Sequence, residues 1–563
     1  MEGSTDQILS NADIADRLAS LAQLLSTQKE NPYKVKAYQR AAANIRMLSE
    51  SLDELVREGA DLTAYAGIGA AISSAIREIV QTGTLRTLEA LRSQASPEIA
   101  EISGHPRLDP RRVLRVYKKL RIASIKALRE RLESGEIEQV LGLRTAQHIR
   151  QGLSETRAIL LYKADDLRDA VEEFLITRCG VRRAEVVGAY RRRVEVIAEL
   201  AFLVDTDDFP AVIAKLERYG GRTPLLSVSN DTAVFALSSG ILLRITRAST
   251  EQWGLALIET TGSTDHLLKL STVTGSLTNL ESQGPFSNET AVYGKFGLAY
   301  IEPELREGHD EVEQAAAGTL PILVSVGDIR GELHAHSTSS DGSDSIEDMA
   351  AAARQHGYEY IGITDHSQTL KLARGVSVDD LWKQIRFIDG LNARTAGIRI
   401  LKSAEVDILA DGSLDYPDDL LRELDYTVCS VHSRFAMGMV EQTERIMRAM
   451  DNRYFNILGH PTGRLLLKRP GYAIDMNRII AHAQQNGCCF EINSSPDRLD
   501  LSAEHAREAG SAGIKIAVST DAHSTREFGL VRFGVDQARR AGLEKTSILN
   551  CLPWNELALL FRR

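Results

Sequence analysis

Cysteine and long hydrophobic runs are both scarce in this sequence of 563 residues. No apolar stretch is long enough to span a membrane, and the first residues lack the basic segment and apolar run of a signal peptide. The few cysteines show no paired framework, which excludes a disulfide scaffold and fits a reducing compartment; they are Cys179, Cys429, Cys488, Cys489 and Cys551. We therefore expect a cytoplasmic protein that does not contact membranes.

An excess of positive charge is also missing. The net charge of −10 argues against indiscriminate binding of nucleic acid by the whole surface. One region departs from this balance, because basic residues cluster between about 105 and 150 while acidic residues are scarce between 107 and 127. A solvated helical face would give the same pattern. We interpret it as a surface that follows DNA phosphates and includes Arg111, Arg112, Lys118 and Lys119.

The last third of the sequence contains nine residues that could bind metals. Most of them end a short apolar run of the kind that forms a parallel strand in an α/β barrel, where polar residues at the strand ends form the active site. His334 and His336 alternate across Ala335, so in a strand both imidazoles point the same way. The nine are His334, His336, Asp341, His366, Glu405, His432, His460, Asp521 and His523.

Imidazole and carboxylate ligands in this number indicate a cluster of metals. A single histidine at a strand end is more often a core residue, but six of the thirteen histidines fall at this one set of strand ends. The ligand types suit Zn, Mn or Fe rather than Ca. Clustered divalent metals are typical of phosphoester hydrolysis, in which one ion activates water and another holds the leaving oxygen.

From about residue 328 to the C-terminus the sequence resembles the PHP domain, in the stretches GELHAHSTSSDGS, ITDHS, AEVDI, SVHSR, GHPTGR, EINSSPDRLD and STDAHS. The resemblance implies a distorted seven-stranded βα barrel with up to three metals. All nine residues match ligand positions of the family, and Glu405 is expected to bridge two metals, with His336 and Asp521 beside it in the catalytic centre. Arg374 and Arg464 could receive phosphate, although a surface ion pair is an equal alternative.

Two residues of the EINSSPDRLD stretch, Asn493 and Arg498, also match the PHP pattern. The resemblance implies that they orient the ligands rather than bind metal themselves.

Residues 10–95 read as helices joined by short turns. Gly67 and Gly69 flank Ile68 between two such helices, which resembles a helix-hairpin-helix turn whose backbone amides approach a DNA phosphate. Lys34 and Lys36 lie in the preceding helix and could contact DNA. Together with the segments that follow, this region resembles the N-terminal part of family X DNA polymerases.

The polymerase resemblance continues to the start of the barrel. EVVGAYRRRVEV and ETTGSTDHLLKL match the nucleotide-binding segments of the family and contain Gly188, Arg192, Gly262 and Ser263. We expect a helical domain at 1–95, a fingers-like helical domain at 96–155, an α+β palm and thumb at 156–318, and the PHP barrel at 319–563.

The catalytic carboxylates of the polymerase are missing from this outline. The family binds two Mg ions with a GDxD motif and a third Asp on a neighbouring strand, but this chain has Glu199 and Ala201 at the first two positions and an apolar residue near Leu242 at the third. Asp205 and Asp207 lie past the strand. The positions of the lyase lysines are occupied by Ala71 and Ala75. The nucleotide site is therefore expected to be vestigial.

These observations favour a metal-dependent DNA phosphoesterase that acts in DNA repair, including base excision repair. Its PHP domain would be a 3′–5′ exonuclease, or an AP endonuclease or 3′-phosphatase, with three Mn, Zn or Fe ions. The polymerase-like half would bind gapped, nicked or primer-template DNA. An active gap-filling polymerase with an attached exonuclease, a small-molecule phosphatase and a non-catalytic DNA-binding module are the alternatives.

Overall fold

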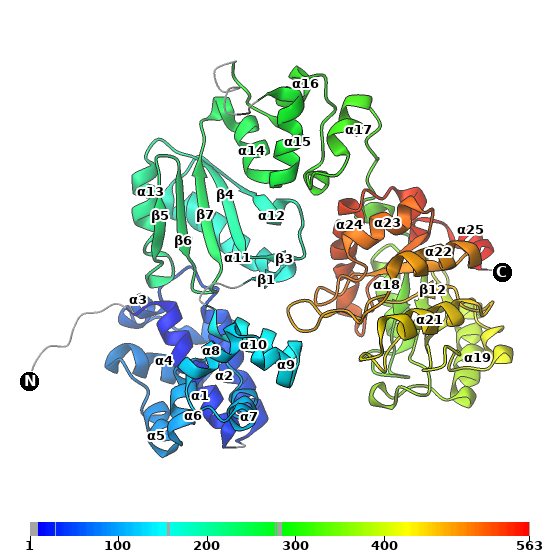
Figure 1. Cartoon of the computed structure of the whole chain (residues 1–563), viewed down its shortest axis with the longest axis horizontal. Coiled ribbons are helices and arrows are strands. Elements are labelled where there is room, and N and C mark those ends of the chain that lie inside the picture. Colours follow the sequence, from blue (N-terminus) through cyan, green and yellow to red (C-terminus); the bar gives the residue numbers. More distant parts are fainter. Residues whose placement is uncertain (1–8, 29, 155–157, 276, 278–283, 562–563) are drawn as a thin grey trace, which may run out of the picture. The chain divides into compact units, whose positions relative to one another are not determined.

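The N-terminal region of the chain is helical, as predicted. The computed structural model describes residues 9–28, 30–154, 158–275, 277 and 284–561, so the predicted boundary at 155 and 156 lies outside the described residues. The first helices (blue in Figure 1) surround one apolar core. They are α1 (Asn11–Thr27), α2 (Pro32–Ile45), α3 (Leu52–Arg57), α4 (Ala70–Thr82), α5 (Arg86–Gln94) and α6 (Pro97–Ser103).

Local capping fixes where these helices begin. The Ser10 hydroxyl accepts a hydrogen bond from the Asp13 amide, and the Asp13 carboxylate accepts one from the Ser10 amide, which satisfies two amides at the start of α1. Gly67 adopts a φ of +80°, and Gly69 caps α4. Ile68 between them is buried, so the hairpin is anchored by its apolar residue and exposes both glycines.

A second group of helices has its own core. It consists of α7 (Pro110–Leu120), α8 (Ile125–Glu133), α9 (Glu136–Leu141) and α10 (Leu143–Leu153). A five-stranded sheet follows in the order β2-β4-β7-β6-β5 (Figure 1). Its strands are β2 (Arg183–Val187), β4 (Glu199–Asp205), β5 (Leu225–Val228), β6 (Thr232–Ala236) and β7 (Leu242–Arg247).

The remaining elements of this middle region are short or lie beside the sheet. A two-stranded ribbon pairs β1 (Ile159–Leu160) with β3 (Val196–Ile197). The helices are α11 (Leu161–Phe174), α12 (Gly188–Arg191), α13 (Phe209–Leu216), α14 (Trp253–Thr261), α15 (Thr264–Thr274), α16 (Glu289–Lys295) and α17 (Glu311–Ala317).

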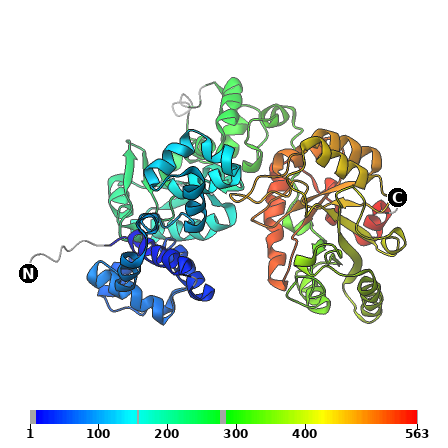
Figure 2. The same cartoon turned by 60° about the horizontal axis from the view of Figure 1, so that its bottom comes forward.

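The last part of the chain is a parallel barrel of seven strands in sequence order (Figures 1 and 2). The strands are β8 (Gly331–Ala335), β9 (Tyr360–Ile363), β10 (Arg399–Asp407), β11 (Tyr426–Ser430), β12 (Ile457–Leu458), β13 (Cys489–Asn493) and β14 (Ile516–Ser519). Hydrogen bonds between Ala522 and the ends of β8 bring the first and last strands together: the His336 amide donates to the Ala522 carbonyl at 2.8 Å. The predicted distorted seven-stranded barrel is thus confirmed.

Helices follow the strands and cover the barrel on its outside (Figures 1 and 2), which explains why the strands are almost entirely buried. These helices are α18 (Ile346–Gln355), α19 (Val378–Arg394), α20 (Asp418–Leu421), α21 (Met439–Met450), α22 (Met476–Asn486), α23 (Ala503–Ser511) and α24 (Val531–Arg540). The C-terminal helix α25 (Trp554–Phe561) packs against residues near the N-terminal ends of the strands, so the opposite end is left for the site.

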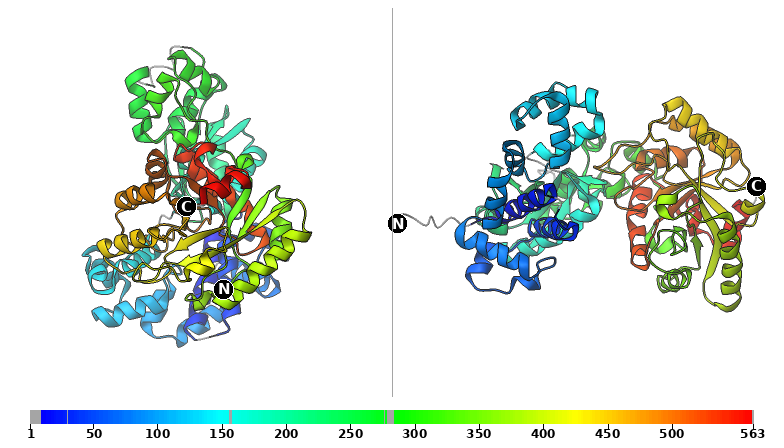
Figure 3. Two further views of the ribbon diagram at one scale, coloured as in Figure 1. Left: turned by 90° about the vertical axis from the view of Figure 1, so that its right-hand side faces the viewer. Right: turned by 90° about the horizontal axis from the view of Figure 1, so that it is seen from below.

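The chain divides into two compact units, shown from two further sides in Figure 3. The N-terminal unit comprises residues 1–191, 196–261 and 275–292, and the C-terminal unit comprises residues 192–195, 262–274 and 293–563. The short segment 192–195 therefore belongs with the barrel. Among the described residues, no helix is both long and apolar enough to cross a membrane.

Candidate functional site

The C-terminal ends of the barrel strands bring all nine predicted ligands into one cluster. His334 lies in β8 and His336 directly after it, Glu405 lies in β10, and the others follow their strands in the connecting loops. Parallel strands end at the same rim of a barrel, so residues far apart in sequence meet there. His334, His336, Glu405 and His460 are almost completely buried.

Eight of the nine residues fall into three overlapping groups whose ligand atoms lie within 4.8 Å of one another. The groups are His336, Asp341, His366 and His523; His334, His336 and Asp521; and His366, Glu405 and His432. The ninth, His460, places its Nε2 at 2.9 Å from a Glu405 carboxylate oxygen. Because His336 and His366 each belong to two groups, the three groups adjoin one another, and the arrangement suits metal ions bound in adjacent positions.

Glu405 occupies the centre of the cluster. Its Oε1 lies 2.9 Å from His460 Nε2 and 3.2 Å from His432 Nε2. Its Oε2 lies 2.7 Å from His366 Nδ1 on the other side. The two oxygens thus face different histidines, which is the geometry that a carboxylate bridging two metals requires. Binding of a metal by each of the nine residues stays a prediction.

The donor atoms of the cluster fit a set of divalent cations. Within the described residues, several buried polar atoms of the cluster have no hydrogen-bond partner. They include His334 Nε2, His336 Nδ1, His460 Nδ1 and Glu405 Oε2. Buried polar atoms without a partner are costly, and metal coordination would satisfy them. Nitrogen and carboxylate oxygen donors together suit Zn, Mn or Fe.

The pKa shifts in the cluster also fit bound divalent cations. Burial raises the pKa of Glu405, but the surrounding histidines His366 and His432 outweigh it and hold that pKa well below its usual range. Burial lowers the pKa of His432, yet Glu405 and Asp407 raise it to about 10. Charge in the cluster must therefore be balanced by protons on imidazoles or by bound cations, and cations would release those protons.

Two carboxylates that sequence reasoning did not single out orient the ligands. Glu491, completely buried in β13, lies 2.7 Å from His334 Nδ1 through one oxygen and accepts the His460 amide at 2.7 Å through the other. Asp407 is hydrogen bonded to His432 Nδ1 at 2.5 Å. Each bond turns the other imidazole nitrogen, Nε2, toward Glu405.

The two arginines predicted to hold phosphate differ in environment. Arg374 is exposed in the loop after β9, in the left-handed region at a φ of +56°, and lines a cavity with Thr338 and Ser339. Arg464 is half-buried: its guanidinium donates to the Arg498 and Leu499 carbonyls and pairs with Glu195 at 2.9 Å. The geometry therefore favours Arg374 as the phosphate contact, and both roles stay predictions.

Asn493 and Arg498 both approach Asp521, one of the predicted metal ligands. The Asn493 amide donates to Asp521 at 3.1 Å, and the Arg498 guanidinium lies 3.8 Å from the same carboxylate. Both are close enough to orient Asp521, and this role stays a prediction.

The polymerase-like sheet places an arginine where the carboxylate site would be. Glu199 on β4 lies opposite Leu242 on β7, and Ala201 lies opposite Arg244. The Arg244 guanidinium donates two hydrogen bonds to Glu199, at 2.8 and 2.9 Å. Glu199 is thus engaged by a cation on the neighbouring strand. That Ala201 and an apolar residue stand in place of its two partners in a Mg site stays a prediction.

Asp207 follows β4, as predicted, but the prediction is wrong for Asp205, which is the last residue of the strand. Both accept hydrogen bonds from the Arg182 guanidinium, at 2.5 and 3.1 Å. Because the Arg182 guanidinium already binds both carboxylates, they are less available to bind Mg.

The residues of the predicted nucleotide site are divided between the two units. Gly188 begins α12 in the N-terminal unit with a φ of +67°, whereas Arg192, Gly262 and Ser263 belong to the C-terminal unit. There, Arg192 pairs with Glu307 at 3.2 Å, and the Ser263 hydroxyl accepts the His266 amide at 3.0 Å.

The predicted DNA-binding residues lie in two parts of the N-terminal unit. Lys34 and Lys36 are exposed on α2, and Gly67 and Gly69 expose the start of α4. Lys34 lies 4.0 Å from Glu30, a distance that leaves it accessible to a phosphate.

The second part is helix α7. Lys118 and Lys119 are exposed in its last turn. Arg111 donates to the Ser26 carbonyl at 3.0 Å, and Arg112 pairs with Asp109 at 3.4 Å. Two of the four residues thus already have partners within the protein.

Two parts of the chain match known domain families. Residues 9–85 match a helix-hairpin-helix domain family, and residues 332–495 match the PHP domain family. A probable phosphatase of Thermoanaerobacter sp. (strain X514) is 30% identical over 233 residues, covering 39% of this chain and 89% of the phosphatase. A probable phosphatase of Acetivibrio thermocellus is 28% identical over 207 residues, covering 35% of this chain and 81% of that protein.

A longer match spans both units. The DNA polymerase/3′-5′ exonuclease PolX of Bacillus subtilis (strain 168) is 32% identical over 574 residues, covering 98% of this chain and 99% of the relative. The chain therefore belongs to the PolX group of family X DNA polymerases, with an N-terminal helix-hairpin-helix domain and a C-terminal PHP domain.

Proposed function

We propose that this chain is a metal-dependent DNA phosphoesterase of DNA repair whose barrel removes nucleotides from 3′ ends. The observation that carries the proposal is the convergence of the nine predicted ligands at the barrel rim, in a chain related throughout its length to a DNA polymerase/3′-5′ exonuclease. Cleavage at abasic sites and removal of 3′ phosphates would need the same chemistry, so the proposal extends to both.

Divalent metals bound in such a cluster activate water and offset the charge that develops on a phosphate in hydrolysis. Glu405 would hold two of them through its separate oxygens, and His336 and His366 would each supply one imidazole nitrogen as a ligand. Glu491 and Asp407 keep the facing imidazoles in the ligating orientation. Arg374, exposed in the loop after β9, would receive a phosphate of the bound strand.

We also propose that the polymerase site is inactive. Two-metal nucleotidyl transfer needs several carboxylates at one point, and the Glu199–Arg244 pair leaves a single carboxylate already bound to a guanidinium. The N-terminal unit would still bind gapped or nicked DNA through Lys34, Lys36, the Gly67–Gly69 turn and α7. Its helix-hairpin-helix domain and its relationship to a DNA polymerase support this role.

A gel assay tests both parts of the proposal. A 5′-labelled primer on a gapped template is incubated with Mn²⁺, with and without dNTPs, using the full chain, His336→Ala and the control His309→Ala, an exposed histidine outside the cluster. We expect the wild type and His309→Ala to shorten the primer whether or not dNTPs are present, and His336→Ala to leave it intact.

Two other outcomes would support other functions. Extension of the primer that survives in His336→Ala would show an active polymerase, which the name of the Bacillus subtilis relative favours. Hydrolysis of small phosphate esters without action on DNA would show a small-molecule phosphatase, which the relatives named probable phosphatases favour.

A further inference from the structure

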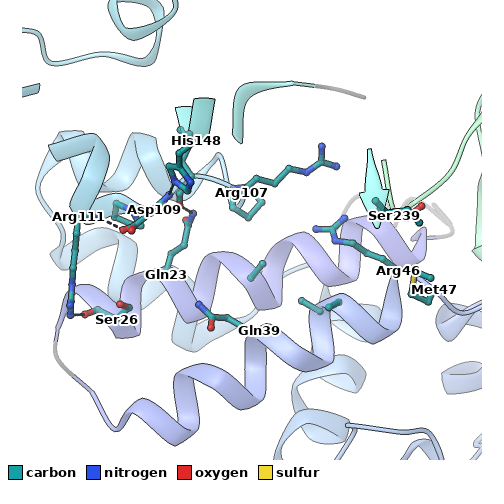
Figure 4. A pocket seen from close by; sticks show the side chains of 17 residues that line it. Gln23, Ser26, Gln39, Arg46, Met47, Arg107, Asp109, Arg111, His148 and Ser239 are labelled. Carbon is teal, nitrogen blue, oxygen red and sulfur yellow. Dashed lines mark hydrogen bonds between the residues drawn. The ribbon is translucent and has the colours of Figure 1, made fainter. Parts of the chain in front are cut away.

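Two of the cavities in the chain differ in what they offer a ligand. The cavity of the N-terminal unit lies between α1, α2, the α6–α7 loop and the start of α7 (Figure 4), and its arginines already have partners. Arg46 pairs with Asp16, and Arg111 donates to the Ser26 carbonyl at 3.0 Å. A second cavity, in the barrel, has an unpaired cation and an exposed aromatic side chain, so it is the stronger candidate for a binding site.

The cavity in the barrel adjoins the cluster of predicted metal ligands. Its volume is about 770 Å³, and its walls are the loop after β8, the start of α18, the loop after β9 and part of α19. Ser339 of its lining lies in the chain between His336 and Asp341. In the other loop, the Val376 amide donates to the His366 carbonyl at 2.8 Å. A group attached to a phosphate at the cluster is therefore placed to enter this cavity.

An aromatic side chain forms part of the cavity wall. Phe387 on α19 is 40% exposed, although it is large and apolar. Ile346 and Val376 add apolar surface to the same lining. Aromatic side chains on which bases stack are common in proteins that bind single strands, because every base has a π face. A cavity of this size with an apolar wall can hold a nucleoside.

The charges of the lining favour an uncharged group inside the cavity and one phosphate beside Arg374. This arginine is exposed, and among the described residues its guanidinium pairs with no carboxylate. The Asp380 carboxylate accepts a hydrogen bond from Lys383 Nζ at 2.6 Å, so these two charges offset each other. Glu347 adds a negative charge that would repel a second phosphate. The cavity thus suits a neutral base whose own phosphate lies with Arg374.

One buried group of the lining lacks a hydrogen-bond partner. Gln384 Nε2 donates to the Asp365 carboxylate at 3.0 Å, and because a carboxylate only accepts, Oε1 is left as the acceptor of the amide. That oxygen is buried without a partner among the described residues. Buried acceptors are normally satisfied, and a donor on the edge of a bound base would satisfy this one.

We propose that this cavity holds the base of the 3′-terminal nucleotide, stacked on Phe387, while Arg374 contacts the phosphate of that nucleotide. The inference rests on the proposed function, since the nucleotide is the one that the barrel removes. It adds that the barrel binds a nucleoside as well as a phosphate ester, so a terminal residue without a base should be removed more slowly.

Cleavage of two single strands by the full chain in Mn²⁺ tests the inference. Both strands are 5′-labelled; one ends in an adenine nucleotide, and the other ends in a tetrahydrofuran residue, which has no base. The variants are Phe387→Ala, which removes the ring, and Phe387→Tyr, which keeps it. Val440→Ala, an exposed apolar change at the start of α21, is the control.

We expect the wild type, Phe387→Tyr and Val440→Ala to remove the adenine nucleotide with a kcat/KM about tenfold above that for the residue without a base. Phe387→Ala should lose about tenfold on the adenine strand and nothing on the other strand. A tenfold change is about 1.4 kcal/mol, which lies within the range for one base stacked on an aromatic side chain. An equal loss on both strands would show that Phe387 has only a structural role and would contradict the proposal.

A binding measurement separates this inference from the proposed function. Isothermal titration calorimetry of the full chain in Mn²⁺ compares dAMP with 2-deoxyribose 5-phosphate, which lacks the base. Tighter binding of dAMP that is lost in Phe387→Ala supports the cavity even where no strand is cleaved, a result that would overturn the proposed function alone. The inference is wrong if strands are cleaved at rates that depend on neither the base nor Phe387, or if dAMP binds Phe387→Ala as it binds the wild type.

Discussion

Residue types and their positions in sequence were enough to predict which side chains converge at the barrel rim, with Asn493 and Arg498 beside them, but not the buried carboxylates Glu491 and Asp407. Histidines and carboxylates at the ends of apolar runs converge wherever those runs form one parallel barrel. Glu491 and Asp407 lie within such runs, and their partners are distant: Glu491 and His334 are 157 residues apart. No local pattern reveals such a pair. The same holds for Arg464, whose partner Glu195 is 269 residues away.

Replacing Glu491 by Gln should weaken metal binding. The substitution keeps the size of the side chain but removes the negative charge that faces His334 Nδ1, so the ligating nitrogen loses basicity and orientation. Loss of such a partner lowers metal affinity about 10- to 100-fold in metalloenzymes. Titration of metal-free protein with Mn²⁺ would measure the effect, and Glu508→Gln, an exposed change on α23, is the control. An unchanged affinity would show that Glu491 does not orient the metal site.

The elements of the barrel follow from sequence more directly than those of the sheet. Most barrel strands contain a short apolar run, and nearly all strand residues are buried. In the five-stranded sheet, the resemblance to family X polymerases predicted that an apolar residue near Leu242 stands in place of the third carboxylate. The structure places Leu242 opposite Glu199. The register of β4 and β7 also puts Arg244 within reach of Glu199, and register between strands 43 residues apart is a tertiary property.

Close packing between two barrel strands predicts a sensitive glycine. A Cβ on Gly362 in β9 would lie 1.7 Å from the Tyr426 hydroxyl of β11, which donates to the Leu333 carbonyl at 2.6 Å. Gly362→Ala should therefore displace Tyr426 and destabilise the barrel by about 1–3 kcal/mol or more. Thermal unfolding followed by circular dichroism would measure the change. Gly390→Ala in α19, where the added Cβ meets nothing closer than 3.9 Å, should leave stability unchanged or raise it; equal effects of the two substitutions would contradict the packing argument.

At the scale of the whole molecule, the chain joins two units that have separate apolar cores. The barrel has one main core around its strands and a smaller one at their N-terminal ends, while the helices and sheet of the N-terminal unit have their own. All nine predicted metal ligands belong to the C-terminal unit. Stabilisation by metal should therefore be confined to that unit, because a ligand stabilises only the structure to which it binds.

Removing the metal should accordingly loosen the barrel and leave the N-terminal helices unaffected. Binding at a thousandfold excess over the dissociation constant contributes about 4 kcal/mol, and chelation removes that contribution. Hydrogen exchange measured by mass spectrometry, with and without a chelator, would locate the change: exchange should rise in peptides from β8 to β14 and stay constant in α1 to α10. In His336→Ala, which removes a residue shared by two ligand groups, the chelator should have a much smaller effect. An equal rise of exchange in both units would show that the metal stabilises the chain as a whole, and that the two units unfold together.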